Sequence, residues 1–381
     1  MTDNTTLLMP RGGLTFLAHL LPYSVATLAA LIALYAIFGG QGQDFENFAL
    51  GEENKAAYGE YEGEPIHCHD VTDAERCLAP ARERDLARSI LWLGNSQLHA
   101  INQMKPGERP ASALLAERWR PRGVEVLAFS QPNASLREHY ILFEYLFAQR
   151  RFTILVLPLV FDDTRENTIR SEIAAAIETP SVRERLEEEP IGKVVLEQLS
   201  SDATEDESGS PTTLQDRTEA WITDRLEDCC RWKTLSLQGR GQIALDLFYF
   251  RNLAFGITAS SKRRVIPAQL ALNLEALDAL LRRAEEAGTK VIAYVVPLRS
   301  DVPPPYVEAE YASFKGTVGE MVRAHSGIFV NLEGLVPGEF WGTKDSTDLT
   351  GGQELDFMHF QFAGHVLLRD AVSGSLKDQL Q

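Results

Sequence analysis

Two short polar motifs, far apart in the chain, contain residue types that can do acyl-transfer chemistry. Gly94-Asn95-Ser96-Gln97 follows an apolar run, so a serine stands on a tight turn with its hydroxyl exposed. Asp356-Phe357-Met358-His359 places an aspartate three residues before a histidine. Such an aspartate can hold the imidazole by its Nδ1–H, which leaves Nε2 free to take a proton from a serine. Each motif also has an ordinary interpretation, as a turn with a helix cap and as a capped helix with a surface histidine.

Chemistry between these motifs needs a scaffold that brings them together, and the apolar pattern predicts one. Five apolar runs are predicted to be buried parallel strands, at residues 89–93, 124–129, 152–160, 291–296 and 328–332. Helical spacing recurs between and after them, at residues 136–149, 270–287, 307–324 and 361–374. This alternation predicts an α/β fold with helices on both faces of a parallel sheet. Ligands bind beyond the carboxyl ends of such strands, which is where Ser96 falls.

With both motifs in this order and context, the sequence resembles the SGNH/GDSL hydrolase superfamily over residues 85–375. The resemblance implies a flavodoxin-like three-layer α/β/α fold with a five-stranded parallel sheet, and it implies no cofactor and no metal. It also implies Ser96 as the nucleophile, His359 as the general base and Asp356 as its orienting partner. The backbone N–H of Ser96 would be one oxyanion donor. Asn95 replaces the aspartate that usually precedes the serine, which is not part of the triad.

The chain departs from the family pattern at the two other oxyanion donors, a glycine after the second strand and an asparagine after the third. Residues 130–135 contain no glycine, although Asn133 could offer a side-chain amide. Asp162 follows the third strand, where a carboxylate would repel a developing oxyanion. One such donor is typically worth about 3–4 kcal/mol of barrier, so these departures are compatible with a slow or inactive site. Arg299, in the loop after the fourth strand, is a candidate substrate contact.

An uncharged segment near the N-terminus is predicted to anchor the chain in a membrane. Residues 14–38 contain no Lys, Arg, Asp or Glu. As a helix they would span ~37 Å, enough to cross a bilayer core of ~30 Å. A cleaved signal peptide is the alternative, but the segment does not end in a small-x-small site. Arg11 before the segment and acidic residues after it predict a cytoplasmic N-terminus, residues 1–13, at a bacterial inner membrane, with the bulk of the chain on the periplasmic side.

The rest of the chain divides by composition. Residues 39–84 are rich in Gly and Glu, with weak periodicity, and are interpreted as a stalk or lead-in. The SGNH-like domain is predicted to comprise residues 85–163 and 263–381. Between its two parts lies a mainly helical insertion, residues 164–262.

Four cysteines lie in the predicted exported part, where disulfides persist. The vicinal pair Cys229 and Cys230 is poorly placed to bond internally, which favours links from Cys68 and Cys77 to that pair. A zinc site is the alternative, because His67-Cys68-His69-Asp70 is followed by Cys77, although no second ligand motif completes it.

The charge balance and the predicted anchor narrow the function to two hypotheses. The net charge of −17 argues against a nucleic-acid-binding surface, which needs basic residues. An anchored SGNH domain resembles the exported partners of membrane-bound O-acyltransferases, which implies a multi-pass membrane acyltransferase or another membrane complex as a partner. One hypothesis is a serine acyl-esterase or O-acyltransferase that acts outside the cytoplasm through an acyl-enzyme. The other is a catalytically degenerate SGNH-like domain that serves as a structural or binding subunit.

Overall fold

The computed structural model describes residues 53–208, 261–345 and 352–380 of the chain. The predicted cytoplasmic N-terminus and membrane anchor, residues 1–38, lie outside this range, as do Cys229 and Cys230. In the part of the chain that is described, no helix has the length and apolar character needed to cross a bilayer.

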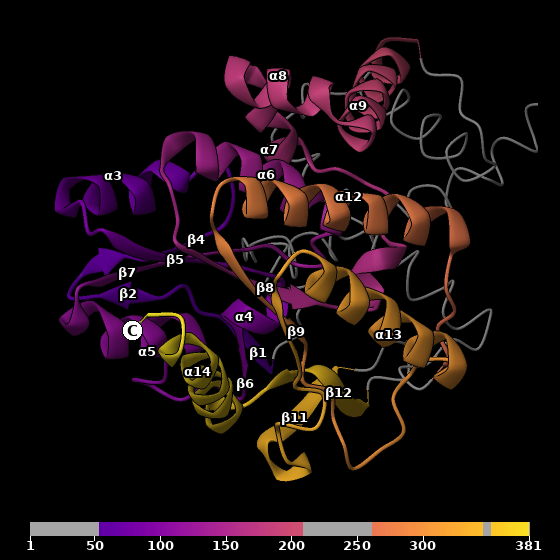
Figure 1. Ribbon diagram of the computed structural model, residues 1–381. Coiled ribbons are helices and arrows are strands. Elements are labelled where there is room, and N and C mark those ends of the chain that lie inside the picture. Colours follow the sequence, from indigo (N-terminus) through magenta and orange to yellow (C-terminus); the bar gives the residue numbers. More distant parts are fainter. Residues whose placement is uncertain (1–52, 209–260, 346–351, 381) are drawn as a thin grey trace, which may run out of the picture. The chain divides into compact units, whose positions relative to one another are not determined.

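A sheet of six parallel strands forms the centre of the fold (Figure 1). The spatial order is β10 (Ile328–Asn331), β9 (Lys290–Val295), β8 (Ile154–Leu159), β5 (Arg88–Gly94), β7 (Val124–Ser130) and β4 (His67–Cys68). The five predicted strands are confirmed, and their order from β7 to β10 is 2-1-3-4-5, which is flavodoxin-like. The predicted number of strands is wrong, because β4 pairs with Ala128 and Phe129 of β7 and adds a sixth.

Both faces of the sheet are covered by helices, because each strand sends alternate apolar side chains to opposite faces. Leu91 and Leu93 of β5 lie in one core, whereas Ile90 and Trp92 lie in the other. The helices over the first core are α3 (Ala74–Arg84), α6 (Leu136–Gln149), α12 (Pro267–Glu286) and α13 (Glu308–Ala324). Those over the second core are α5 (Ala111–Trp119) and α14 (Phe362–Lys377). The predicted three-layer α/β/α architecture and its four predicted helices are confirmed (Figure 1).

The stalk predicted at residues 39–84 is wrong where this segment is described, because residues 53–84 pack into the domain. Their strands before β4 are β1 (Asn54–Ala56), β2 (Glu60–Tyr61) and β3 (Glu64–Pro65). Strand β1 pairs antiparallel with β6 (Ala100–Asn102), and α3 buries Cys77, Leu78 and Ala81 completely. Strands of two or three residues are too short to show a period in the sequence, which is why composition alone indicated a stalk.

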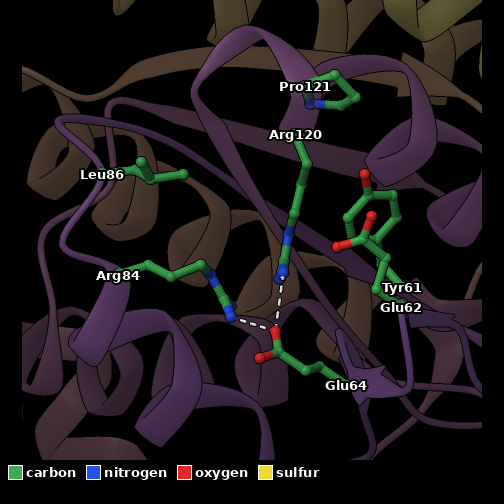
Figure 2. A pocket seen from close by; sticks show the side chains of 7 residues that line it. All are labelled: Tyr61, Glu62, Glu64, Arg84, Leu86, Arg120 and Pro121. Carbon is green, nitrogen blue, oxygen red and sulfur yellow. Dashed lines mark hydrogen bonds and ion pairs between the residues drawn. The ribbon is translucent and has the colours of Figure 1, made fainter.

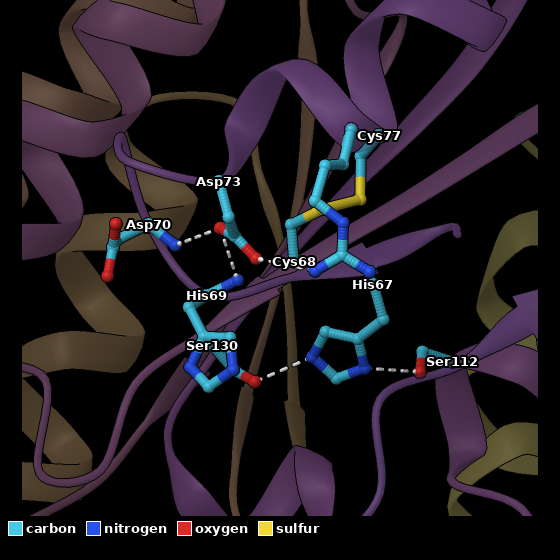
Figure 3. The surroundings of a disulfide bond; sticks show 9 residues. His67, Cys68, His69, Asp70, Asp73, Cys77, Ser112 and Ser130 are labelled. Carbon is cyan, nitrogen blue, oxygen red and sulfur yellow. Dashed lines mark hydrogen bonds and ion pairs between the residues drawn. A yellow bond between two sulfur atoms is a disulfide. The ribbon is translucent and has the colours of Figure 1, made fainter.

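A disulfide between Cys68 and Cys77 joins β4 to α3 (Figure 3). The predicted links to Cys229 and Cys230 are therefore wrong. The zinc alternative is wrong as well, because both thiols are used in this bond and the two ring nitrogens of His67 face hydroxyl groups. His67 Nδ1 lies 2.8 Å from Ser112 Oγ, and Nε2 lies 2.6 Å from Ser130 Oγ.

The described part of the predicted insertion, residues 164–208, is mostly helical. Its elements are the end of η2 (Asp162–Arg165), α7 (Ser171–Ala174), η3 (Ala175–Glu178), α8 (Pro180–Glu188) and α9 (Pro190–Ser208). Helix α8 packs against α6, and α9 packs against α12, so this segment covers the outside of a helical layer and not the sheet itself.

The last elements carry one of the two polar motifs. After β10, the short helix η4 (Gly338–Phe340) precedes an antiparallel pair, β11 (Trp341–Asp345) and β12 (Gln353–Phe360). Asp356 and His359 lie on β12, which leads directly into α14.

A cleft of about 400 Å³ lies near the amino ends of the central strands, at the end of the sheet away from Ser96 (Figure 2). This end of the sheet is called the amino edge. Arg84 at the end of α3 and Arg120 in η1 (Arg120–Arg122) both pair with Glu64 in this cleft. Both arginines also pair with Glu125, a fully buried residue at the start of β7. The amino edge is therefore held by a network of ion pairs.

Candidate active site

The serine turn is built by the end of β5 and a four-residue helix, α4 (Ser96–His99). Asn95 caps this helix, and its Oδ1 accepts a hydrogen bond from the Gln97 N–H at 3.0 Å. Gly94 is needed because a Cβ there would come within 2.8 Å of the Leu98 Cβ, so any side chain would prevent the helix from folding back over the strand. Ser96 becomes the first residue of α4 and keeps 7% of its surface exposed.

The two polar motifs meet at this turn. Ser96 Oγ lies 3.0 Å from His359 Nε2, and His359 Nδ1 lies 3.0 Å from Asp356 Oδ2. An ionised carboxylate can only accept hydrogen bonds, so Nδ1 carries the imidazole proton and Nε2 accepts from the serine hydroxyl. The structure thus brings Ser96, His359 and Asp356 together, with His359 between the other two as predicted.

Asp356 is held in its ionised form by donors on all sides, although it is only 1% exposed. Its Oδ1 accepts from the backbone N–H groups of Met358 and His359, and its Oδ2 accepts from Asn54 Nδ2 at 2.8 Å. Burial alone would raise the pKa of Asp356. The charge of His359 and the hydrogen bonds from His359 and Met358 outweigh burial and leave this pKa below its ordinary value. Asn102 in turn donates to Asn54 Oδ1 at 3.0 Å.

Gln97 connects the serine turn to the strand that carries the histidine. Its Nε2 donates to the carbonyl oxygen of Met358 at 2.8 Å and to that of Pro297 at 2.9 Å. The role of Gln97 is not predictable from the sequence, although this residue belongs to the first motif, because a lone glutamine has no pattern that assigns it a partner. Asn54 and Asn102 are not predictable either, because their only signal is a polar residue in a very short strand.

The three other candidate residues are not joined to the triad by any contact among the described residues. Asn133 is exposed, in the left-handed conformation (φ 51°), in the turn before α6. Asp162 pairs with Arg263 and Arg165 and accepts from the Tyr306 hydroxyl.

The guanidinium of Arg299 is already occupied. It donates to both carboxylate oxygens of Asp301, at 2.8 and 3.1 Å, and to the carbonyl oxygen of Gly342 at 2.8 Å. The observed role of Arg299 is to fasten the loop after β9 to β11. The substrate contact of Arg299 stays a prediction.

A second set of buried histidines lies beside the serine turn. His99, at the end of α4, has its Nδ1 2.7 Å from Ser130 Oγ, the same hydroxyl that His67 contacts. Ser130 is 1% exposed, so this second serine–histidine contact is sealed from solvent. Figure 3 shows the contact of the same hydroxyl with His67. Burial, together with the charges of neighbouring histidines, holds the pKa of His67 well below its usual value, which favours a neutral His67 ring.

Comparisons with known proteins find similar solved structures and no match by sequence. No family model and no curated protein matches the sequence. The chain is similar to TesA, with 14% identity and a TM-score of 0.38, over 77% of this chain and 99% of TesA. It is also similar to a mutant of Axe2, an acetyl-xylooligosaccharide esterase from Geobacillus Stearmophilus, with 12% identity and a TM-score of 0.37, over 76% of this chain and 94% of Axe2.

This chain resembles the SGNH/GDSL hydrolases. The strand order and the contacts of Ser96, His359 and Asp356 agree with what that resemblance implies. The chemistry of the site follows from the contacts within this chain.

Proposed function

We propose that the chain is an SGNH-type serine acyl-esterase or O-acyltransferase that works through an acyl-enzyme. The observation that carries this proposal is the continuous hydrogen-bond chain from Asp356 through His359 to Ser96, with two links of 3.0 Å. A serine hydroxyl is a weak nucleophile until a base lies within hydrogen-bond reach, and a base works best when a third group fixes its tautomer. Both conditions hold here.

The reaction follows from this arrangement. Ser96 Oγ attacks the carbonyl carbon of an ester while His359 Nε2 takes the hydroxyl proton. The tetrahedral intermediate collapses, the ester C–O bond breaks, and the leaving alcohol takes the proton from His359. Water or a sugar hydroxyl then attacks the acyl-enzyme, with His359 again accepting and returning a proton. Asp356 stays ionised and stabilises the imidazolium at each stage.

The developing oxyanion needs donors, and the Ser96 N–H is proposed as the first. The first N–H groups of a helix have no partner within the helix, so this group at the start of α4 is free to donate. The departures at residues 130–135 and at Asp162 favour the second hypothesis, a catalytically degenerate domain that serves as a structural or binding subunit of a membrane complex. The test below separates the two.

Fluorophosphonate labelling of the full chain in detergent tests the proposed nucleophile. We expect covalent labelling of the wild type and none of Ser96→Ala. Ser130→Ala is the matched control, because Ser130 also contacts a histidine ring nitrogen but is sealed from solvent. Labelling that survives Ser96→Ala and disappears in Ser130→Ala contradicts the assignment. No labelling of folded wild type, under conditions that label a serine esterase, favours the degenerate subunit.

We further propose that residues 14–38 anchor the protein in a bacterial inner membrane with the domain on the periplasmic side, where a multi-pass membrane acyltransferase or another membrane complex would be its partner. The Cys68–Cys77 disulfide supports an oxidising compartment. A reporter fused to the C-terminus and active only outside the cytoplasm should be active. Activity of a cytoplasm-specific reporter at the same position contradicts this topology.

A further inference from the structure

A buried pair of polar residues, Asn95 and Asp163, lies directly behind the serine. Asn95 precedes Ser96, and Asp163 lies in η2, beyond the carboxyl end of the neighbouring strand β8. Asn95 Nδ2 donates to Asp163 Oδ2 at 3.2 Å, while Asn95 Oδ1 accepts from the Gln97 N–H. Both residues of the pair are 2% exposed. The amide is thus fixed at both ends, and Asp163 determines the position of the residue that caps α4.

Two adjacent carboxyl groups in η2 have opposite surroundings. Asp162 pairs with Arg263 and Arg165 and accepts from the Tyr306 hydroxyl. Asp163 has one amide donor and no cation among its described contacts. A buried carboxylate without a cation is costly, and the usual outcome is that the group takes up a proton.

The charged groups around Asp163 shift its pKa in both directions. Burial raises the pKa of Asp163 well above its ordinary value, and the charges of Asp162 and Glu166 raise it further. The hydrogen bond from Asn95 and the charge of Arg170 lower it without offsetting burial. Arg170 is itself bound to Glu138 through Nε at 2.8 Å and Nη2 at 2.6 Å, so its charge is shared.

We propose that Asp163 works in its protonated, neutral form, as a positioning residue that holds Asn95 and the serine turn without placing a negative charge behind the reacting carbonyl. The carbonyl oxygen of a protonated carboxyl still accepts the Asn95 hydrogen bond, so the geometry does not need the charge. This inference rests on the proposed function.

The pH dependence of activity tests this inference. In wild type, hydrolysis of p-nitrophenyl acetate, corrected with Ser96→Ala, should fall about 10²-fold at alkaline pH as Asp163 ionises beside the developing oxyanion. Asp163→Asn should keep the activity seen at lower pH and lose this alkaline fall. Asp162→Asn removes a neighbouring negative charge, so Asp163 should ionise more easily and the fall should move to lower pH. An alkaline fall that is unchanged in Asp163→Asn overturns the inference.

An exchange of the two side chains gives a second test. Asn95→Asp places two carboxyl groups in contact and should lower activity about 10²-fold. Adding Asp163→Asn restores one amide and one carboxyl in the reverse order, and activity should return to within about tenfold of wild type. A double variant no better than Asn95→Asp overturns the inference.

The protonation of Asp163 can also be measured without activity. At neutral pH, wild type should show the infrared C=O band of a protonated carboxyl, and Asp163→Asn should lack it. If folded wild type is not labelled at Ser96, the proposed function fails and the infrared band alone decides the state of Asp163. If Ser96 is labelled and the band is absent, this inference fails while the proposed function stands.

Discussion

Glu125 and Asp163 are both buried carboxyl groups, and they are held in different ways. Glu125 lies near the amino ends of the strands, and Asp163 lies beyond their carboxyl ends. Glu125 is fully buried at the amino edge, where Arg84 Nε donates to it at 2.9 Å and Arg120 forms a second ion pair. Asp163, beyond the carboxyl edge, has one amide donor, Asn95, and no cation among its described contacts. Two cations thus pair with Glu125, whereas burial without a paired cation raises the pKa of Asp163.

The same contrast extends to the buried histidines, which lie toward the carboxyl side. Burial lowers the pKa of His139 to about 3, and the charge of Arg170 contributes. Burial also lowers the pKa of His365 to about 3, against a hydrogen bond to the Ala100 carbonyl. Asp356 is an exception, a charged group whose donors are all in place. At the carboxyl side the buried charge of Asp356 therefore orients His359, whereas at the amino edge the buried charge of Glu125 joins Arg84 and Arg120.

The largest expected effect comes from removing the general base at the carboxyl side. His359→Ala should lower esterase activity by about 10⁴-fold or more, since the serine then has no proton acceptor. The fold should be retained, because Asp356 keeps its bonds from Asn54 and from the backbone N–H groups of residues 358 and 359. His325→Ala is the control, because His325 pairs with Asp278 and Glu285 outside the site and its loss should leave activity intact. Equal losses in both variants would point to misfolding.

Disrupting the ion pairs at the amino edge should lower the stability of the fold and leave the active site intact. Glu125→Ala removes the fully buried carboxylate that pairs with Arg84 and Arg120 and leaves Glu64 as their partner in this network. The free energy of unfolding measured by urea denaturation should fall by about 3 kcal/mol. The fraction that stays folded should still be labelled at Ser96. In the control, Glu117→Ala removes an exposed partner of Arg109 and should cost at most about 1 kcal/mol. Similar costs for the two variants contradict the contrast between the edges.

Acid should destabilise the carboxyl side through its neutral histidines. His139 and His365 have folded pKa values of about 3, below the ~6.5 expected when unfolded, so the unfolded state binds more protons as the pH falls. Their contribution is complete above pH ~6.5 and is lost as the pH falls toward 3. Each should cost about 2 kcal/mol of unfolding free energy between pH 7 and pH 5.

Variants are needed for this measurement, because Asp163 acts in the opposite sense. Its raised pKa means that its contribution to stability is lost as the pH rises, so it partly masks the wild-type slope. His365→Gln should therefore show about 2 kcal/mol less acid loss than wild type in urea denaturation at the two pH values. An identical loss in this variant contradicts the role assigned to His365.

The sequence predicts the triad and the five strands because each rests on a local signal. Ser96 follows a glycine at the end of an apolar run, and Asp356 lies three residues before His359. The five strands that it predicts are apolar runs bounded by turn residues. Strand β4 has only two residues, and its stability comes from pairing with β7 and from the disulfide to α3. Such long-range contacts leave no local pattern.

The polar residues around the triad show the same limit. Asn54 and Asn102 come from short strands that pair with each other, and no periodicity marks them. Sequence position also cannot decide which of two adjacent aspartates faces the site. Asp162 turns toward Arg263, 101 residues away in the chain, and Asp163 turns toward Asn95. The orientation of each side chain depends on partners that only the fold brings near.

The smallest effect we expect is on Gln97, which joins the serine turn to the histidine strand without touching a charge. Gln97→Ala removes the hydrogen bonds to the carbonyl oxygens of Met358 and Pro297. The bond to Met358 holds the serine turn to the strand that carries His359, so without it the distance between Ser96 Oγ and His359 Nε2 is less well fixed. We expect kcat to fall about tenfold, with KM nearly unchanged, because positioning of the reacting atoms is lost and no binding group is removed. Gln361→Ala is the control, because its bond to Gln103 lies outside this link. A change confined to KM would show that Gln97 contacts substrate and does not act through the triad.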